Sequence, residues 1–218
     1  MNLTGKLFAP CDSASLAFFR ITFGVLLFVE TCRYFINGWI GGVFVAPPFH
    51  FTYLGFDWVR PFPSDAMYLL FIATGIAALL VAFGIWTRTA SFFLACSLTY
   101  VLLLEKAAYL NHLYLICLLA FLLSFVPTDS MWSITRLRRH ENGSSQVPTI
   151  SLLILRSQVA IPYVYGAIAK LNGDWLSGQP MQMWMSRMTH VRAFVPAFGD
   201  LWLALVFSYG GFFLDLLI

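Results

Sequence analysis

The sequence predicts an all-α fold, a polytopic transmembrane bundle of about six helical spans. The chain of 218 residues is 60% hydrophobic and only 11% charged, whereas soluble domains are about 25% charged. Several of its apolar runs also approach the ~20 residues that a helix needs to cross a bilayer. Both observations predict an integral, multi-pass membrane protein that is surrounded by membrane lipid.

Charge and cysteine usage exclude two classes of function. The formal net charge is only +3 and spread out, with no basic run suited to nucleic acid, so we expect no nucleic-acid partner. The four cysteines show no CxxC spacing and lie in or beside apolar segments, where cysteine usually behaves as a small hydrophobe. We therefore predict neither a disulfide nor a metal site.

The first predicted span, Leu16–Ile36, is interrupted by three charges. Arg20, Glu30 and Arg33 need not share one helix face, so we expect each to lie near an end or to face a protein partner. The connection that follows, Asn37–Asp65, is long and rich in aromatic residues and proline. It either folds back over the bundle as a lid or lining of its mouth, or forms an aromatic belt at the membrane interface.

The next spans are predicted from their length. Ala66–Trp86 is uncharged and long enough to cross a bilayer. One helix over Ala90–Val126 would be ~55 Å long against a hydrocarbon core of ~30 Å, so we predict a hairpin of two short helices instead. The polar residues of the segment 105–112, among them Asn111 and His112, then lie near its tip.

The hydrophilic loop Ser130–Pro148 determines the expected orientation. Its arginines favour the cytoplasm, and counting helices then places the N-terminus there too. The fifth span runs from about Val147 to Lys170, and a sixth begins near Leu201. Because of helix parity, His112 and Lys170 share one side of the membrane, the non-cytoplasmic side in this orientation. An imidazole and an amine can therefore meet there in one pocket open to a lipid-soluble substrate.

The fifth span carries a polar stripe. Arg156, Tyr163 and Lys170 are spaced seven apart, which places them within about 40° of one helical face. A charge in such a segment costs at least ~2.5 kcal/mol on insertion scales, so the stripe is expected to face a bundle interior or a wet cavity. A snorkelling lysine at a helix end explains Lys170 equally well. Asp174 and Trp175 are expected to cap and anchor the turn that positions Lys170, and we count them with the predicted substrate-binding residues.

Several motifs together resemble a known family. They are LRSQ (155–158), GAIAKLNGDWLSGQP (166–180), EKAAYLNHLYL (105–115), LAFFRITFG (16–24), FTYLGFDWVRPFP (51–63), GIWTRTASFFL (84–94) and YGGFFLDLL (209–217). They closely resemble the vitamin K-dependent γ-glutamyl carboxylase and its bacterial relatives, the horizontally transferred transmembrane (HTTM) domain proteins. The likeness covers nearly the whole chain, so we interpret residues 1–218 as one HTTM domain. Because the apolar run Leu201–Ile218 stops within a helix, we expect the chain to be truncated at its C-terminus.

The resemblance implies a carbon–carbon lyase in the plasma membrane, which is the inner membrane if the protein is bacterial. Such an enzyme couples epoxidation of vitamin K hydroquinone, or a related quinol, by O2 to carboxylation of a peptide or protein glutamate by CO2, without a metal. The lysine that matches Lys170 is the base that deprotonates the quinol. The histidine that matches His112 stabilises the oxygenated intermediate, and Asn111 is its neighbour in the motif. Burial of a lysine in an apolar pocket favours the neutral amine that a base requires.

Three more residues of the fifth span are predicted to bind substrate, each with a structural alternative. Arg156 pairs with an anionic substrate group, or neutralises a buried carboxylate such as Glu30 or Asp215. Gln158 and Tyr163 hydrogen-bond a quinol oxygen, or only neighbouring helices.

The chain also departs from the carboxylase. Ala169 precedes Lys170 where the carboxylase has a second lysine, and the carboxylase has a larger membrane part and a lumenal propeptide-binding domain that this sequence does not include. Quinol oxidation is therefore better supported than processive carboxylation. Two alternatives stay open: a non-redox membrane factor that binds or matures a peptide such as a toxin, and a polar network of Lys170, His112 and Arg156 that only fixes helix packing.

Overall fold

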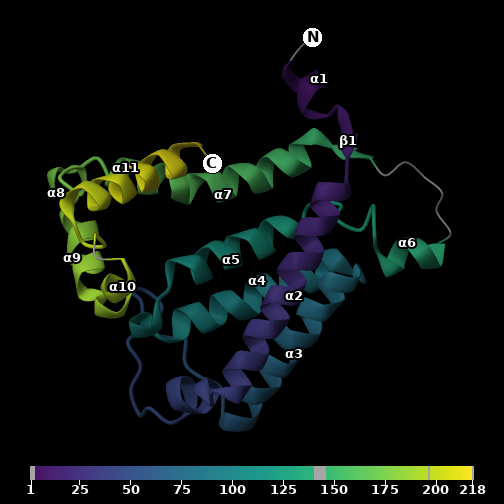
Figure 1. Cartoon of the computed structure of the whole chain (residues 1–218). Helices are drawn as coiled ribbons and strands as arrows, with labels where there is room; N and C mark the ends of the chain where they lie inside the picture. The colour runs from purple at the N-terminus through teal and green to yellow at the C-terminus, as the bar shows by residue number, and fades with distance from the viewer. Residues whose placement is uncertain (1–2, 140–145, 196, 218) are drawn as a thin grey trace. The chain divides into compact units, whose positions relative to one another are not determined.

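The computed structural model describes residues 3–139, 146–195 and 197–217, most of them helical (Figure 1). The chain forms two compact units, Met1–Leu155 and Arg156–Ile218. The first unit contains α1 (Leu3–Leu7), β1 (Pro10–Asp12), α2 (Ala14–Ile36), η1 (Ile40–Val45), α3 (Ser64–Phe83), α4 (Thr87–Leu104), η2 (Lys106–Ala108), α5 (Asn111–Leu123), α6 (Ile134–Arg139), β2 (Gln146–Pro148) and the start of α7 (Thr149–Ala169). The second unit contains the rest of α7, α8 (Gly173–Leu176), α9 (Gln179–Arg187), α10 (Thr189–Phe194) and α11 (Leu201–Leu217).

The all-α class is confirmed, but the predicted number of spans needs correction. Four helices of the described ranges are long and apolar enough to cross a membrane, namely α2, α3, α4 and α7. The other two predicted spans are the shorter apolar helices α5, of 13 residues, and α11, of 17 residues. Helix α5 is short because Glu105 caps a separate 3-10 turn, with its carboxylate accepting from the Ala107 N–H, and Tyr109 and Leu110 are extended.

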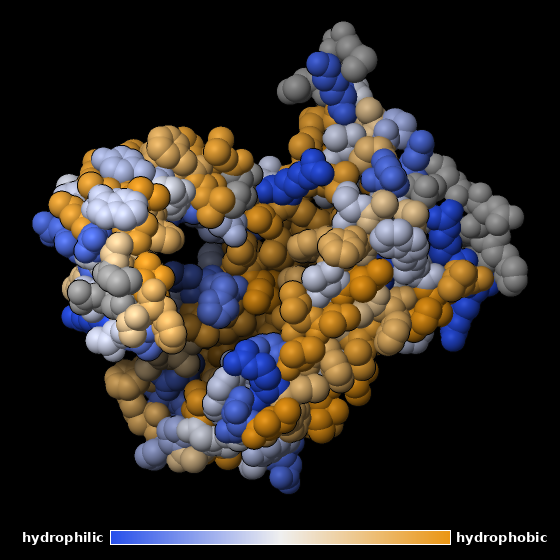
Figure 2. Space-filling model, in the orientation of Figure 1, coloured by the Kyte–Doolittle hydropathy of each residue, from blue (hydrophilic) through white to orange (hydrophobic). Residues whose placement is uncertain are grey.

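Helices that follow one another in the first unit pack side by side, α2 on α3, α3 on α4 and α4 on α5 (Figure 1). The α2–α3 pair approaches closely because Gly24 has no side chain. A Cβ atom there would lie 2.6 Å from both Ala78 O and Ala82 N, so the two backbones touch at this point. Small residues at a helix crossing are typical of membrane helices. Much of the visible surface over the helices of this unit is hydrophobic (Figure 2), which agrees with membrane burial.

Arg20 of α2 is completely buried and ties three segments of the first unit together. Its Nη1 donates to Val81 O and Ala82 O at 2.7 Å each, where α3 ends. Its Nε donates to Thr128 O at 3.0 Å and its Nη2 to Trp132 O at 2.6 Å, in the segment after α5. Of the two alternatives expected for this charge, a place near a helix end or contact with a protein partner, the structure shows contact with other segments of the chain.

The aromatic connection after α2 is partly core. The π-helical turn η1 buries Ile40 and Phe44 against Met67 and Phe71 of α3 and Leu104 of α4. Neither a lid nor an interfacial belt describes this part of the loop, which packs as a structural element of the first unit.

Two short strands, which the sequence did not predict, join the start of the chain to the start of α7. Strands β1 and β2 pair antiparallel, with Cys11 opposite Val147. The Thr149 hydroxyl extends this contact by donating to Ala9 O at 2.8 Å. Residues 140–145 of the predicted cytoplasmic loop lie outside the described residues.

Candidate functional site

The end of α7 places Lys170 in a local structure that Asn172 fixes. The Lys170 N–H donates to Gly166 O and Ala167 O, so the lysine belongs to the last helical turn. The Asn172 side chain then donates to Ala169 O at 2.7 Å and accepts from the Trp175 N–H at 2.9 Å. A single amide side chain therefore connects the end of α7 to the first turn of α8, as asparagine does at helix N-caps.

Three groups surround the Lys170 amine, and we call them with the lysine the Lys170 cage. Nζ lies 2.5 Å from Asp215 Oδ2 and donates to Gly211 O at 3.2 Å, and it lies 5.2 Å from the centroid of the Trp175 ring. The side chains of Lys170 and Asp215 are only 20% and 16% exposed. A carboxylate, a carbonyl and an aromatic face all attract a cation, so this arrangement suits a protonated lysine.

Two features hold the partners of the Lys170 cage in place. The Trp175 indole donates to Ser208 O at 2.9 Å, which fixes the ring against α11. Gly166 lies beside the carboxylate, and a Cβ atom there would be only 2.8 Å from Asp215 Oδ2. The absence of a side chain at position 166 therefore leaves the room that Asp215 occupies.

The other residues predicted on α7 make no hydrogen bond or ion pair with the described members of the Lys170 cage. Arg156 and Tyr163 are exposed and Gln158 is half-buried. Within the described part of their unit, none of the three has a hydrogen bond or an ion pair. Of the two carboxylates that the sequence suggested as partners of Arg156, Asp215 pairs with Lys170. Glu30 belongs to the first unit, where it pairs with Arg33 at 2.5 Å. Both the substrate-binding role of Arg156 and its structural alternative stay predictions.

Asp174 and Trp175 differ in what they do. Trp175 joins the Lys170 cage as described, whereas the Asp174 side chain is exposed and its residue contributes a backbone carbonyl to the Ser177 hydroxyl. Their predicted contacts with substrate stay predictions.

Asn111 and His112 form the exposed first turn of α5. They belong to the first unit and Lys170 to the second, so the predicted meeting of imidazole and amine stays a prediction.

A pocket of about 460 Å³ lies between α4 and α5. Its walls are mostly aromatic and aliphatic, and its lining residues include Trp58, Phe92, Tyr100, Tyr114, Leu118 and Phe121. Asn111 lies seven residues before Leu118 in the same helix, so the two residues are about 20° apart around the α5 axis. Asn111 therefore lies on the pocket-lining face of α5, whereas His112 is rotated by a further ~100°.

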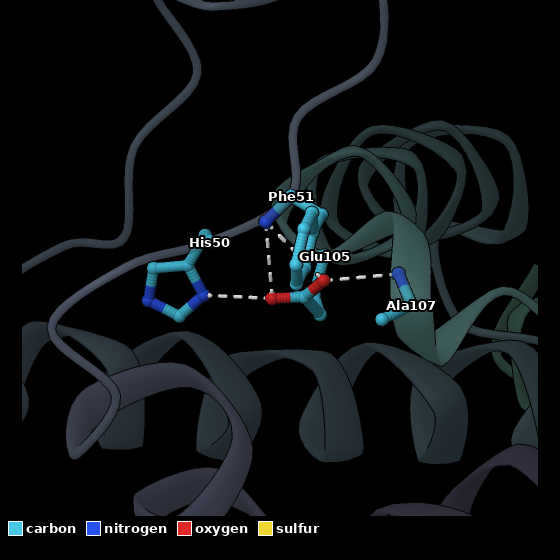
Figure 3. Close-up of polar contacts among 4 residues, drawn as sticks. All are labelled: His50, Phe51, Glu105 and Ala107. Atoms are coloured by element: carbon cyan, nitrogen blue, oxygen red, sulfur yellow. Dashed lines mark hydrogen bonds and ion pairs between the residues drawn. The ribbon is translucent and has the colours of Figure 1, made fainter.

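A polar cluster around Glu105 was missed by the sequence reasoning (Figure 3). Glu105 Oε2 lies 3.2 Å from His50 Nδ1, and Oε1 accepts from the Ala107 N–H at 2.9 Å. The Phe51 N–H donates to the same carboxylate, and Phe51 O accepts from the Lys106 N–H at 2.7 Å. The side chains of His50 and Glu105 are only 12% and 10% exposed. Glu105 thus fixes the long connection to the tip of the hairpin that leads into Asn111.

Tyr53 lies in the same connection. Burial raises the pKa of Tyr53 above its ordinary value, and the neighbouring Tyr109 and Glu105 raise it further. The phenol is therefore neutral at physiological pH. Its buried oxygen has no hydrogen-bond partner among the described residues.

Comparison with known proteins identifies the family. The model of the HTTM domain matches residues 8–218, which is nearly the whole chain and includes both α5 and the Lys170 cage. No solved structure matches the chain. With four helices able to cross a membrane, the chain is a membrane protein that belongs to the HTTM domain family.

Proposed function

We propose that this protein is a vitamin K-dependent carboxylase-like enzyme that oxidises a membrane-soluble quinol with O2. HTTM membership and the motifs around Asn111 and Lys170 support this class. The observation that carries the proposal is the position of the Lys170 amine. It is largely buried at the end of an apolar helix, and a carboxylate that can exchange a proton with it lies 2.5 Å away.

The proposed residue roles follow from the resemblance to the carboxylase. Lys170 removes the hydroxyl proton of the quinol, which requires the neutral amine. His112 stabilises the oxygenated product of that step, with Asn111 beside it. The pocket between α4 and α5 has the size and apolar lining that a lipophilic ligand requires. Epoxidation then drives carboxylation of a peptide or protein glutamate by CO2.

The same proposal includes an orientation. The N-terminus faces the cytoplasm, and the Lys170 side of the membrane is non-cytoplasmic, since the arginines of the segment 130–148 favour the cytoplasmic side. For a bacterial protein this membrane is the plasma or inner membrane.

One observation favours a second candidate, a non-redox factor that binds or matures a peptide. Lys170 is ion-paired with Asp215, and an ammonium that keeps its proton cannot deprotonate a quinol. This candidate predicts a protein that folds, engages a peptide and produces no epoxide.

Epoxide formation separates the two candidates. Purified protein is incubated with reduced vitamin K and O2, and epoxide is measured by chromatography. We expect epoxide from the wild type and from Lys6→Ala, an exposed lysine of α1, and none above background from Lys170→Ala. All three proteins are first shown to be folded and inserted in membranes. Full epoxidation by Lys170→Ala removes Lys170 from the mechanism, and no epoxide from the folded wild type supports the peptide factor.

A further inference from the structure

The three groups that contact the Lys170 amine differ in one chemical property. The Gly211 carbonyl and the Trp175 ring attract an ammonium but cannot accept its proton. The Asp215 carboxylate attracts the ammonium and can also take a proton from it. Asp215 is therefore the one member of the Lys170 cage that can convert the ammonium into an amine without involving water.

Asp215 forms its ion pair with Lys170. In the described part of the second unit, no other charged side chain forms an ion pair or hydrogen bond with either Lys170 or Asp215. Both side chains are mostly removed from solvent. Gly166 opposes Asp215 from α7 and leaves no space for a side chain of its own, so the carboxylate is held against the amine.

We infer that Asp215 is a positioning residue that holds Lys170 and takes its proton during quinol oxidation, an inference that rests on the proposed function. The resting pair is ammonium and carboxylate. As the quinol O–H bond breaks and a new N–H bond forms on Nζ, one N–H bond of the ammonium breaks and an O–H bond forms on Asp215 Oδ2. The products are a quinolate, an ammonium and a carboxylic acid, so no free amine has to accumulate in the resting pair. Every proton is accounted for, and no atom changes its oxidation state in this step.

This role has a consequence for pH dependence. Transfer within the pair needs no exchange of protons with water, so in the wild type the reaction does not wait for the ammonium to lose its proton to solvent. Without the carboxylate the proton must leave to water, and the supply of amine then rises about tenfold per pH unit. A purely structural Asp215 would produce no such difference, because the amide of Asp215→Asn still accepts a hydrogen bond from Lys170.

The first experiment measures the amine directly and needs no turnover. Wild type and Asp215→Asn are reductively methylated with formaldehyde at neutral pH, and mass spectrometry follows the modification of Lys170. Lys6 and Lys106, both exposed, serve as internal references. We expect Lys170 to react roughly tenfold faster in Asp215→Asn, since only a neutral amine attacks. Asp200→Asn, an exposed carboxylate just before α11, should leave the rate unchanged.

The second experiment measures epoxide formation across pH. The rate of epoxide formation by Asp215→Asn should be about a hundredfold lower than that of wild type at neutral pH. It should increase as the pH is raised, whereas the wild-type rate should not. Equal methylation of Lys170 in wild type and Asp215→Asn overturns the inference. So does a rate of Asp215→Asn that equals the wild-type rate or follows the wild-type pH dependence. Faster methylation with no epoxide from wild type rejects the proposed function and upholds Asp215 as the group that controls the amine.

A second variant tests the same contact if Asp215→Asn does not fold. Gly166→Ala leaves the carboxylate in the chain but places a methyl carbon only 2.8 Å from the present position of Asp215 Oδ2, so the carboxylate must shift. It should also accelerate methylation of Lys170. Gly210→Ala is its matched control, because a Cβ atom there meets nothing within 4 Å. Equal methylation in the two alanine variants contradicts the inference.

Discussion

Arg20 and Lys170 are both cations of apolar helices, yet the chain treats them in opposite ways. Arg20 is fully buried, and backbone carbonyls from two other segments, the end of α3 and the segment after α5, accept its hydrogen bonds. Lys170 is one-fifth exposed, and its shortest contact is with a carboxylate. Neither a guanidinium nor a backbone carbonyl changes its protonation in a protein. A lysine and an aspartate both can.

This difference separates structure from chemistry. The Arg20 site stabilises the first unit by satisfying carbonyls that the ends of α3 and the segment after α5 would otherwise leave buried and unpaired. The Lys170 cage has a proton to give and a group to receive it. The type of partner, more than the presence of a buried charge, indicates which cation takes part in a reaction.

The largest effect on stability should come from Arg20→Lys. Lysine keeps the charge but cannot reach carbonyls in three directions, so buried acceptors lose their donors. We expect the free energy of unfolding, measured by SDS titration in mixed micelles, to fall by about 3 kcal/mol or more. Arg88→Gln, which changes an exposed arginine at the start of α4, is the control. A stability of Arg20→Lys equal to that of the control would show that the carbonyl contacts are not needed.

A somewhat smaller effect is expected from Gly24→Ala. The new methyl group would overlap the backbone of α3 at Ala78 and Ala82, and a backbone cannot rotate aside. The helices must separate, at a cost of about 1–3 kcal/mol. In Gly75→Ala the Cβ atom meets only side chains, those of Thr31 at 3.3 Å and Phe28 at 3.8 Å, so the loss should be smaller. Equal losses in the two variants would argue against close contact of α2 and α3.

The smallest effect is expected from Glu105→Gln in the cluster of Figure 3. The amide keeps one acceptor oxygen where the carboxylate accepts from His50, Phe51 and Ala107. We expect a loss of about 1–2 kcal/mol, seen as faster proteolysis of the segment 46–63. Asp57→Asn, in which an exposed acceptor for the Thr52 hydroxyl is retained, should leave the cleavage rate unchanged. Cleavage of Glu105→Gln at the wild-type rate would mean that Glu105 does not hold the connection.

Hydropathy was enough to predict most of the helices. The expected spans Leu16–Ile36 and Ala66–Trp86 correspond to α2 and α3 within a few residues, and the hairpin with a polar tip corresponds to α4 and α5. Lys170 also lies at the end of α7, as its sequence neighbours predicted. The predicted count of six spans was too high partly because α5 begins only after the 3-10 turn η2 and has 13 residues.

The partners of the charges could not be predicted in the same way. Asp215 lies 45 residues from Lys170, and the carbonyls that receive Arg20 lie 61 to 112 residues away. Hydropathy indicates that a residue is in an apolar helix but not which neighbour faces it. One signal was available in hindsight. Asp215 is a charged residue inside an apolar helix, which is unusual, and Gly166 of α7 makes room for it.

Lys170→Arg tests the central claim most directly. Arginine keeps a cation beside Asp215 but remains charged and cannot act as a base. Epoxide formation from reduced vitamin K and O2 is compared between wild type and Lys170→Arg at equal folded fractions. The account predicts a stable Lys170→Arg protein whose epoxidation rate falls about a hundredfold or more. Epoxidation by folded Lys170→Arg at the wild-type rate would contradict it.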